Sequence, residues 1–248
     1  MREEKIVACM LDIGEALLTS GAEVNRIEDT IIRIGEAYGF VRVDVLTITA
    51  SIVLTVHTAK EEILTQTRRI RKTEINMERV DQLNALSRTI CETKPELEYV
   101  EQQIERIRNT SHYSESMMLL AYIMVAASFT VFFGGNAVDA LISAVSSVLV
   151  RILVRIGTRI RMNPIFQNMM CAAAAGIFVL MLSKLGMHFN TDSIVIGNVM
   201  LLIPGLALTS ALRDIIGGDL ITGSLVMIEA VLKAVAIAIG FAVLLIGG

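Results

Sequence analysis

The residues best placed to do chemistry lie in an apolar stretch of the second half of the chain. Pro204 and Gly205 interrupt an apolar run, and the hydroxyls of Thr209 and Ser210 follow one turn later. Because proline has no backbone N–H and glycine weakens the same turn, a helix should kink or break here. Backbone that is not helical inside an apolar segment needs protein or water beside it. The pattern predicts a site for a small polar molecule, with a simple proline kink as the alternative interpretation.

Charged residues extend this candidate site on its C-terminal side. Arg213 and Asp214 end the interrupted run, Asp219 follows a Gly-Gly turn, and Glu229 and Lys233 lie four positions apart in the last apolar run. That spacing permits an ion pair on one helix face, and charges in a membrane usually face a protein interior or a wet cavity. We expect Arg213 to attract a carboxylate. We expect Asp214, Asp219 or Glu229 to carry a coupling proton, since burial raises the pKa of a carboxyl group. The alternatives are a charged loop and a structural ion pair.

Motifs of common enzyme classes are missing from the sequence. It contains no G-x-S-x-G elbow, no H-E-x-x-H pair and no P-loop. The histidines and cysteines are too scattered to build a metal site of local spacing. We therefore predict a protein that is not an enzyme and that holds no cofactor and no metal. The scattered residues are His57, His112, His188, Cys9, Cys91 and Cys171.

The distribution of charge divides the chain into two halves. The first 116 residues carry 35 of the 47 Lys, Arg, Asp and Glu residues, and the net charge of −3 does not favour nucleic acid. The other 132 residues hold long apolar runs, and runs of about 17–25 such residues indicate membrane-spanning helices. The sequence predicts an α-helical integral membrane protein with five transmembrane helices, preceded by a cytoplasmic α+β domain. The domains cover residues 1–116 and 117–248, with spans at about 117–133, 137–156, 167–186, 194–213 and 222–246.

Basic residues predict the orientation of these spans. Arg151, Arg155, Arg159 and Arg161 cluster between the second and third expected spans, whereas the neighbouring connections carry almost no basic residue. The positive-inside rule puts this cluster in the cytoplasm. With five spans, the N-terminus is then also cytoplasmic and the C-terminus lies outside. The first residues lack the apolar core of a signal peptide, which agrees with this orientation.

The first 116 residues predict two helices, three strands and two more helices. Apolar residues recur at helical spacing, and β-branched residues then alternate with polar ones. Residues Ser20 to Glu23 match a capping box before the second helix, and Pro95 suits the first turn of the last helix. Arg26 and Asp29 are interpreted as surface charges beside this cap. The expected elements cover residues 6–19, 24–38, 41–45, 48–57, 63–70, 77–91 and 95–109.

Two long motifs resemble the threonine/serine exporter family. They cover residues 18–28 (LTSGAEVNRIE) and residues 203–223, which contain IPGLALTSALRD and GDLITG. Residues 67–70 (TRRI) and 83–88 (LNALSR) fit the same pattern, and the likeness extends over essentially the whole chain. The resemblance implies a multi-pass protein of a prokaryotic plasma membrane that exports small polar metabolites, driven by the proton gradient. One branch exports threonine and serine, and another resembles a two-subunit exporter of dicarboxylates such as succinate.

The chain departs from the single-chain pattern of this family. It ends after five expected spans, where fused members continue into a second hydrophobic domain. It therefore resembles the larger subunit of the split form and is similar to the succinate-exporter large subunit. The resemblance implies a small membrane subunit that carries the missing spans, besides the lipid bilayer and a small-molecule substrate. A homo-oligomer is left open, and no nucleic-acid partner is expected.

Together these observations predict a subunit of a secondary transporter that exports small polar carboxylate metabolites. A membrane-anchored sensor or regulator is the main alternative, because the expected cytoplasmic domain could bind a ligand without transport. A hydrolase in that domain is the weaker alternative, since no catalytic motif supports it. One arginine can accommodate either an amino acid or a dicarboxylate, so these residues leave the substrate open.

Overall fold

The computed structural model describes residues 2–71, 75–110 and 113–244. Its contacts group the chain into two compact units. The first, called the α+β unit, consists of Met1–Ser111 and Thr209–Met227. The second, called the helical unit, consists of His112–Leu208 and Ile228–Gly248. The segment Thr209–Met227 thus groups with the N-terminal residues, although it lies in the apolar half of the sequence.

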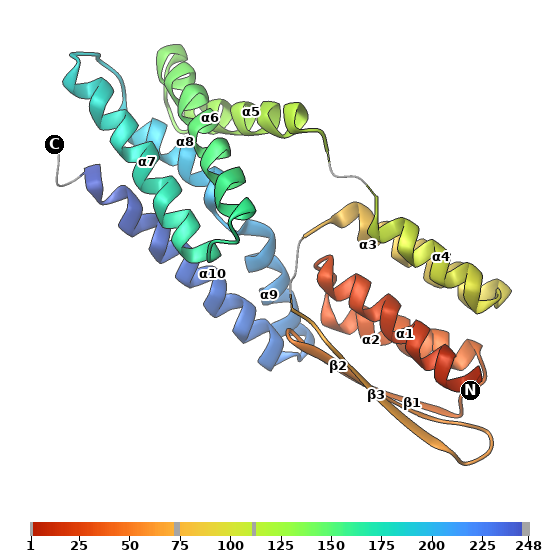
Figure 1. Ribbon diagram of the computed structural model, residues 1–248. Helices are drawn as coiled ribbons and strands as arrows, with labels where there is room; N and C mark the ends of the chain where they lie inside the picture. The colour runs from red at the N-terminus through yellow and green to blue at the C-terminus, as the bar shows by residue number, and fades with distance from the viewer. Residues whose placement is uncertain (1, 72–74, 111–112, 245–248) are drawn as a thin grey trace. The chain divides into compact units, whose positions relative to one another are not determined.

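Helices and a small antiparallel sheet build the N-terminal part of the α+β unit. The elements are α1 (Arg2–Thr19), α2 (Val24–Ala37), β1 (Arg42–Ile48), β2 (Ser51–His57), β3 (Ile63–Arg69), α3 (Met77–Thr93) and α4 (Leu97–Arg108). Strand β2 lies between β1 and β3, and Leu54 pairs with Val45 on one side and with Gln66 on the other. Helices α1 and α2 cover one face of the sheet, and α3 and α4 pack on the other side of α1 (Figure 1).

The burial pattern of β2 explains why the sheet needs this cover. Burial alternates along Ser51–His57, because successive side chains of a strand point to opposite faces. Ile52, Leu54 and Val56 are fully buried in the core that the helices complete. The predicted order of helices and strands is confirmed. The expected strand over residues 48–57 is divided, since β1 ends at Ile48 and β2 begins only after a turn.

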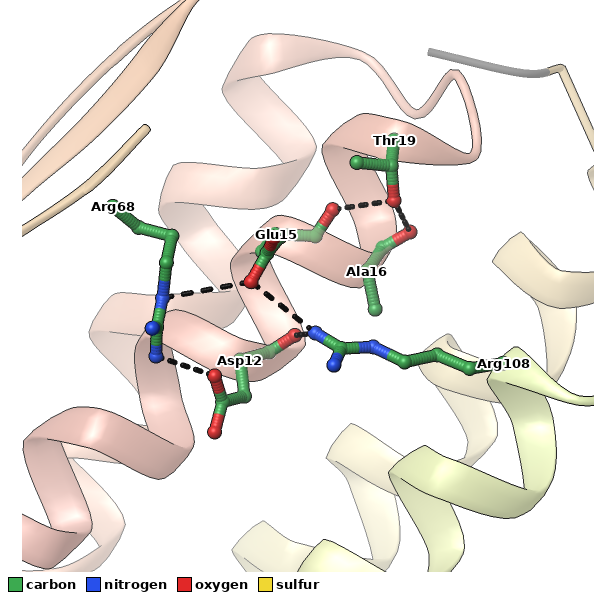
Figure 2. A network of polar contacts seen from close by, with 6 residues as sticks. All are labelled: Asp12, Glu15, Ala16, Thr19, Arg68 and Arg108. Carbon is green, nitrogen blue, oxygen red and sulfur yellow. Dashed lines mark hydrogen bonds and ion pairs between the residues drawn. The ribbon is translucent and has the colours of Figure 1, made fainter. Parts of the chain in front are cut away.

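A network of ion pairs joins α1 to β3 and α4 (Figure 2). Asp12 and Glu15 lie one turn apart on α1. Arg68 of β3 contacts both carboxylates, with 3.5 Å between its Nε and Glu15 Oε2. Arg108 of α4 donates to Glu15 Oε2 at 3.3 Å and to the backbone oxygen of Asp12 at 3.4 Å. These side chains are only 28 to 39 % exposed, so water screens the network less than it screens an exposed pair.

Two helix starts in the α+β unit differ from the prediction. Ser20 is buried directly after α1, where its N–H donates to the carbonyls of the preceding turn and its own carbonyl accepts from the N–H of Asn76 at 3.0 Å, so it does not cap α2. Glu23 is the N-cap residue of α2, and its side chain makes no cap hydrogen bond. Helix α4 begins at Leu97 rather than at Pro95, whose carbonyl accepts from the hydroxyl of Tyr38 at 3.2 Å. In both places tertiary contacts outweigh the local sequence signal.

Long apolar helices make up most of the second half of the chain (Figure 1). They are α5 (Glu115–Phe132), α6 (Ala137–Arg159), α7 (Pro164–Lys184), α8 (Thr191–Leu202), α9 (Gly205–Gly217) and α10 (Leu220–Phe241). Within the described residues, α5, α6, α7 and α10 are long and apolar enough to span a membrane, and the bent pair α8 and α9 would form a fifth span. The expected spans agree with these helices to within a few residues. The expected end of the last span at residue 246 lies outside the described residues.

Candidate functional site

The interruption at Pro204 breaks a helix. Helix α8 ends at Leu202, Ile203 has an extended backbone (φ −63°, ψ 127°) and α9 begins at Gly205. Proline disfavours helical backbone at the preceding residue and supplies no N–H of its own. The two helices are bent by 58° at this break, and the N–H of Leu208 donates to the carbonyl of Pro204 at 3.0 Å. The break predicted from the Pro-Gly pair is confirmed.

A buried polar cluster, made of Ser143, Ser146 and Asn198, lies on α6 and α8 in the helical unit. Asn198 is 1 % exposed, and its Nδ2 donates to Ser143 Oγ at 3.2 Å. Ser143 Oγ in turn donates to the Ala126 carbonyl of α5 at 3.3 Å. Gly197 permits this close packing, because a Cβ there would lie 2.7 Å from the same carbonyl oxygen. Sequence analysis missed the cluster, although Asn198 is a conspicuous amide in an apolar run.

Two oxygens of the polar cluster have no hydrogen-bond partner in the part of the chain that the structure describes. They are Oδ1 of Asn198 and Oγ of Ser146, and both side chains are buried. A buried polar atom left unpaired costs about 1–3 kcal/mol. Asn198 Oδ1 only accepts hydrogen bonds, whereas the Ser146 hydroxyl can accept or donate, so together they suit an ammonium or hydroxyl group. Within the described residues no group of three or more His, Cys, Asp or Glu side chains could hold a metal ion.

Asp139, in contrast, has a structural role in the helical unit. It is 1 % exposed, and its Oδ2 accepts from the N–H of Asn136, which caps α6 in a reciprocal capping box. Its Oδ1 accepts from the N–H of Asn190, the N-cap residue of α8, at 2.9 Å. Its two oxygens therefore fix the starts of two helices, and the carboxylate lies at the positive end of the α6 dipole, where a negative charge is stabilised.

Arg213 and Asp214 lie near the end of α9, within the α+β unit. Arg213 forms an ion pair with Glu23, the N-cap residue of α2. Asp214 is 6 % exposed, and its carboxylate faces the backbone N–H of Val24. The Arg213 side chain is nevertheless 69 % exposed, so its guanidinium has N–H donors left for a second carboxylate beside that of Glu23. The capping-box interpretation of Glu23 missed this partner, which lies 190 positions away in the sequence.

Asp219 follows α9, and its negative charge affects the pKa of Glu28, a residue that was not predicted as part of the site. One of the Asp219 oxygens is buried without a hydrogen-bond partner within the described residues. Glu28 of α2 accepts from the N–H of Thr47 at 2.7 Å. Burial raises the pKa of Glu28, the Thr47 hydrogen bond opposes this shift, and the negative charge of Asp219 adds to it. Glu28 belongs to the motif LTSGAEVNRIE, which is the sequence signal that could have identified it.

The other predicted site residues lie in two different units. Thr209 and Ser210 are consecutive residues of α9 in the α+β unit, the first exposed and the second half-buried. Glu229 and Lys233 of α10 belong to the helical unit, and the ion pair that their spacing permits forms with 2.7 Å between Nζ and Oε1. A charged residue in an apolar helix is expected to face the protein interior or a wet cavity. The Glu229 side chain is instead 58 % exposed on this chain.

Comparison with known families adds an independent observation. The model of the threonine/serine exporter (ThrE) family matches residues 8–246, which is nearly the whole chain. No curated protein and no solved structure matches the sequence. The family match and the long apolar helices identify a multi-pass membrane protein of the transporter class. The chain belongs to the threonine/serine exporter family.

Proposed function

We propose that the chain is the larger subunit of a proton-coupled secondary transporter that exports threonine and serine. Dicarboxylates such as succinate are the second substrate class. The observation that carries this proposal is the broken helix α8–α9. It breaks at Pro204, and its first segment carries the buried Asn198 oxygen that has no hydrogen-bond partner within the described residues. Discontinuous helices place backbone polar groups at the substrate and ion sites of many transporters.

In this proposal the polar cluster receives the hydroxyl or ammonium group of the substrate. Asn198 Oδ1 and Ser146 Oγ lack hydrogen-bond partners within the described residues, and their burial strengthens hydrogen bonds to them. Backbone groups at Pro204 and Gly205 contact the substrate as access alternates between the two sides. The hydroxyls of Thr209 and Ser210 contribute from α9. Along this path, hydrogen bonds to protein groups replace the hydrogen bonds that the polar substrate makes with water.

Charged residues supply carboxylate recognition and coupling. Arg213 attracts the substrate carboxylate through the guanidinium N–H groups that the ion pair with Glu23 leaves exposed. One of the carboxyl groups of Asp214, Asp219 and Glu229 carries the proton. Asp214 is supported by its burial and Asp219 by its unpaired oxygen among the described residues.

The arrangement in the membrane completes the proposal. Residues 1–116 form a cytoplasmic domain and residues 117–248 the membrane domain, in the plasma membrane of a prokaryote. The N-terminus is cytoplasmic and the C-terminus lies outside. A small membrane subunit provides the second hydrophobic domain. The exposed carboxylate of Glu229 supports such a partner, because a charged group that faces lipid is unfavourable.

The test is efflux of preloaded, labelled threonine, serine and succinate from proteoliposomes under an imposed proton gradient. We expect efflux of threonine and serine when the chain and the small subunit are both present. Efflux of succinate alone would reassign the substrate class. No efflux of any of the three from a demonstrably folded pair would overturn the transporter assignment.

Variants of the polar cluster link efflux to the structure. We expect Asn198→Ala and Ser146→Ala each to reduce threonine efflux about tenfold, the effect of losing roughly 1.4 kcal/mol of hydrogen bonding. The matched control is Ser183→Ala, which removes a hydroxyl from an exposed position of α7. Equal efflux by all three variants would remove the polar cluster from the substrate path.

A further inference from the structure

A polar groove lies between α2 and α3 in the α+β unit. Its volume is about 380 Å³, near the lower end of the roughly 300–1,000 Å³ typical of small-molecule sites. Two packed helices usually close such a space with apolar side chains. Here the buried residues at its base are Thr30 and Ser87, which are small and polar. The groove therefore stays open because the side chains at its base are small, and these side chains present hydroxyl groups to it.

The hydroxyl groups at the base have acceptor capacity left for a ligand. Thr30 Oγ1 donates to the Arg26 carbonyl at 2.7 Å, and Ser87 Oγ donates to the Asn84 carbonyl at 2.8 Å. A hydroxyl has one donor and two lone pairs. Since each donor is already used within its own helix, the oxygens can accept from a ligand. A group that donates hydrogen bonds, such as an ammonium or a hydroxyl, fits this base.

The walls of the groove carry charges of both signs. Arg33 and Asp29 pair with each other at 3.0 Å. The other charged residues of the wall make no ion pair within the described residues; they are Arg26, Asp81, Arg88 and Glu92. The lining thus holds three arginines and three carboxylates, and its formal charge is balanced. This balance does not favour a phosphate or another polyanion, whereas separated charges of both signs complement a zwitterion.

We propose that the groove between α2 and α3 is a binding site for a small zwitterionic amino acid. Arg88 and Arg26 hold its carboxylate, which a guanidinium can contact with two hydrogen bonds. Asp81 holds its ammonium group. A side-chain hydroxyl reaches the polar base of the groove. The choice of threonine and serine as first ligands rests on the proposed function, and such a site lets the exporter respond to the concentration of its own substrate.

Cys91 provides a reporter for this site that does not depend on transport. It lines the groove and is half-buried. The other two cysteines of the chain are buried, Cys9 at 3 % and Cys171 at 1 % exposure. Burial raises the pKa of the Cys9 thiol to about 12 and also raises that of Cys91. Because the thiolate is the reacting form, alkylation at about pH 9 should modify Cys91 before the buried thiols.

The experiment measures the rate of Cys91 alkylation by iodoacetamide in the full chain in lipid nanodiscs, read by peptide mass spectrometry. At a ligand concentration about ten times its Kd, L-threonine or L-serine should slow alkylation about tenfold. Isopropanolamine, which lacks the carboxylate, and β-hydroxybutyrate, which lacks the ammonium group, should give no comparable protection. Unchanged rates with both amino acids up to their solubility, or equal protection by the two incomplete ligands, would overturn the proposal.

Variants separate this site from the transport path. Arg88→Ala and Asp81→Asn should abolish the protection, whereas Arg106→Ala, at an exposed position of α4 outside the groove, should keep it. Protection that persists in both groove variants would also overturn the site. Protection without any efflux from proteoliposomes would refute the proposed function and leave the groove site intact. Efflux without protection of Cys91 would refute the groove site and leave the proposed function intact.

Discussion

At the scale of single residues, Glu28 is a partly buried carboxyl group of the α+β unit whose pKa is raised. Burial and the charge of Asp219 raise the pKa of its carboxyl group above the ordinary value of 4.5, against the opposing hydrogen bond from Thr47. The folded chain therefore binds this proton more tightly than the unfolded chain does. By linkage, this group makes the α+β unit less stable as pH rises from 4.5 through the raised pKa.

The first prediction follows from that sign. Glu28→Gln keeps an acceptor oxygen for the N–H of Thr47 but removes the buried charge. The variant should be more stable than the natural chain at neutral pH, and its stability should change less with pH above 4.5. Thermal unfolding midpoints between about pH 4 and pH 8 check this. Glu36→Gln, at an exposed position of the same helix, is the control, and a Glu28→Gln profile that matches it would contradict the prediction.

At the scale of elements, the break between α8 and α9 is the feature most open to a direct test. Pro204→Ala should restore a continuous helix, because proline disfavours helix by about 3 kcal/mol relative to alanine. We expect a folded chain whose efflux falls at least about tenfold, since that free energy exceeds the roughly 1.4 kcal/mol of one decade. Pro164→Ala is the matched control, because Pro164 lies in the first turn of α7, where proline is tolerated. Unchanged efflux in Pro204→Ala would make the break a simple kink.

The ion-pair network of Figure 2 gives a prediction for the α+β unit. Arg68→Ala leaves Asp12 without its ion-pair partner and Glu15 with Arg108 alone. We expect a loss of about 1–2 kcal/mol, more than an exposed pair because the side chains are mostly buried. Hydrogen exchange in β2 should then be faster by roughly tenfold.

The control for that change is the next residue on the strand. Arg69 is exposed on the other face of β3, since successive side chains of a strand alternate. Arg69→Ala should leave hydrogen exchange in β2 near its original rate. Equal acceleration by both variants would mean that the network of Figure 2 adds no stability beyond a surface charge.

How far the sequence predicts these elements depends on the range of the forces involved. The spacing of apolar residues and the backbone properties of proline and glycine are local signals. The order of elements and the break at Pro204 could therefore be predicted from the sequence. Ser20 and Pro95 were misplaced, because buried tertiary contacts decide where α1 ends and α4 begins. Asn198 and Ser146 were missed for the same reason: only the packing of separate helices buries their oxygens and leaves them without a partner in the described part of the chain.

At the scale of the whole molecule, the charged face of α10 bears on the proposed small membrane subunit. Lys233 is 21 % exposed and Glu229 is 58 % exposed, although both lie in an apolar helix long enough to span a membrane. Their mutual ion pair reduces the unfavourable energy of each charge but leaves part of the carboxylate uncovered. A helix of a partner subunit that supplies a polar or basic group would cover it, as the proposed two-subunit exporter requires.

Replacing both charges by leucine distinguishes a partner from lipid. If this face contacts only lipid, Glu229→Leu with Lys233→Leu should stabilise the chain in the membrane and leave efflux unchanged. Our proposal predicts instead a folded chain whose Kd for the small subunit rises at least about tenfold. This change equals a loss of roughly 1.4 kcal/mol of binding free energy. That affinity is measured by co-purifying the two detergent-solubilised subunits over a series of small-subunit concentrations. The control is Leu225→Ala with Leu232→Ala, which changes exposed apolar positions of α10 and keeps both charges. If the leucine pair binds the small subunit as tightly as the natural chain does, the charged face belongs to the lipid boundary, and the partner must dock elsewhere.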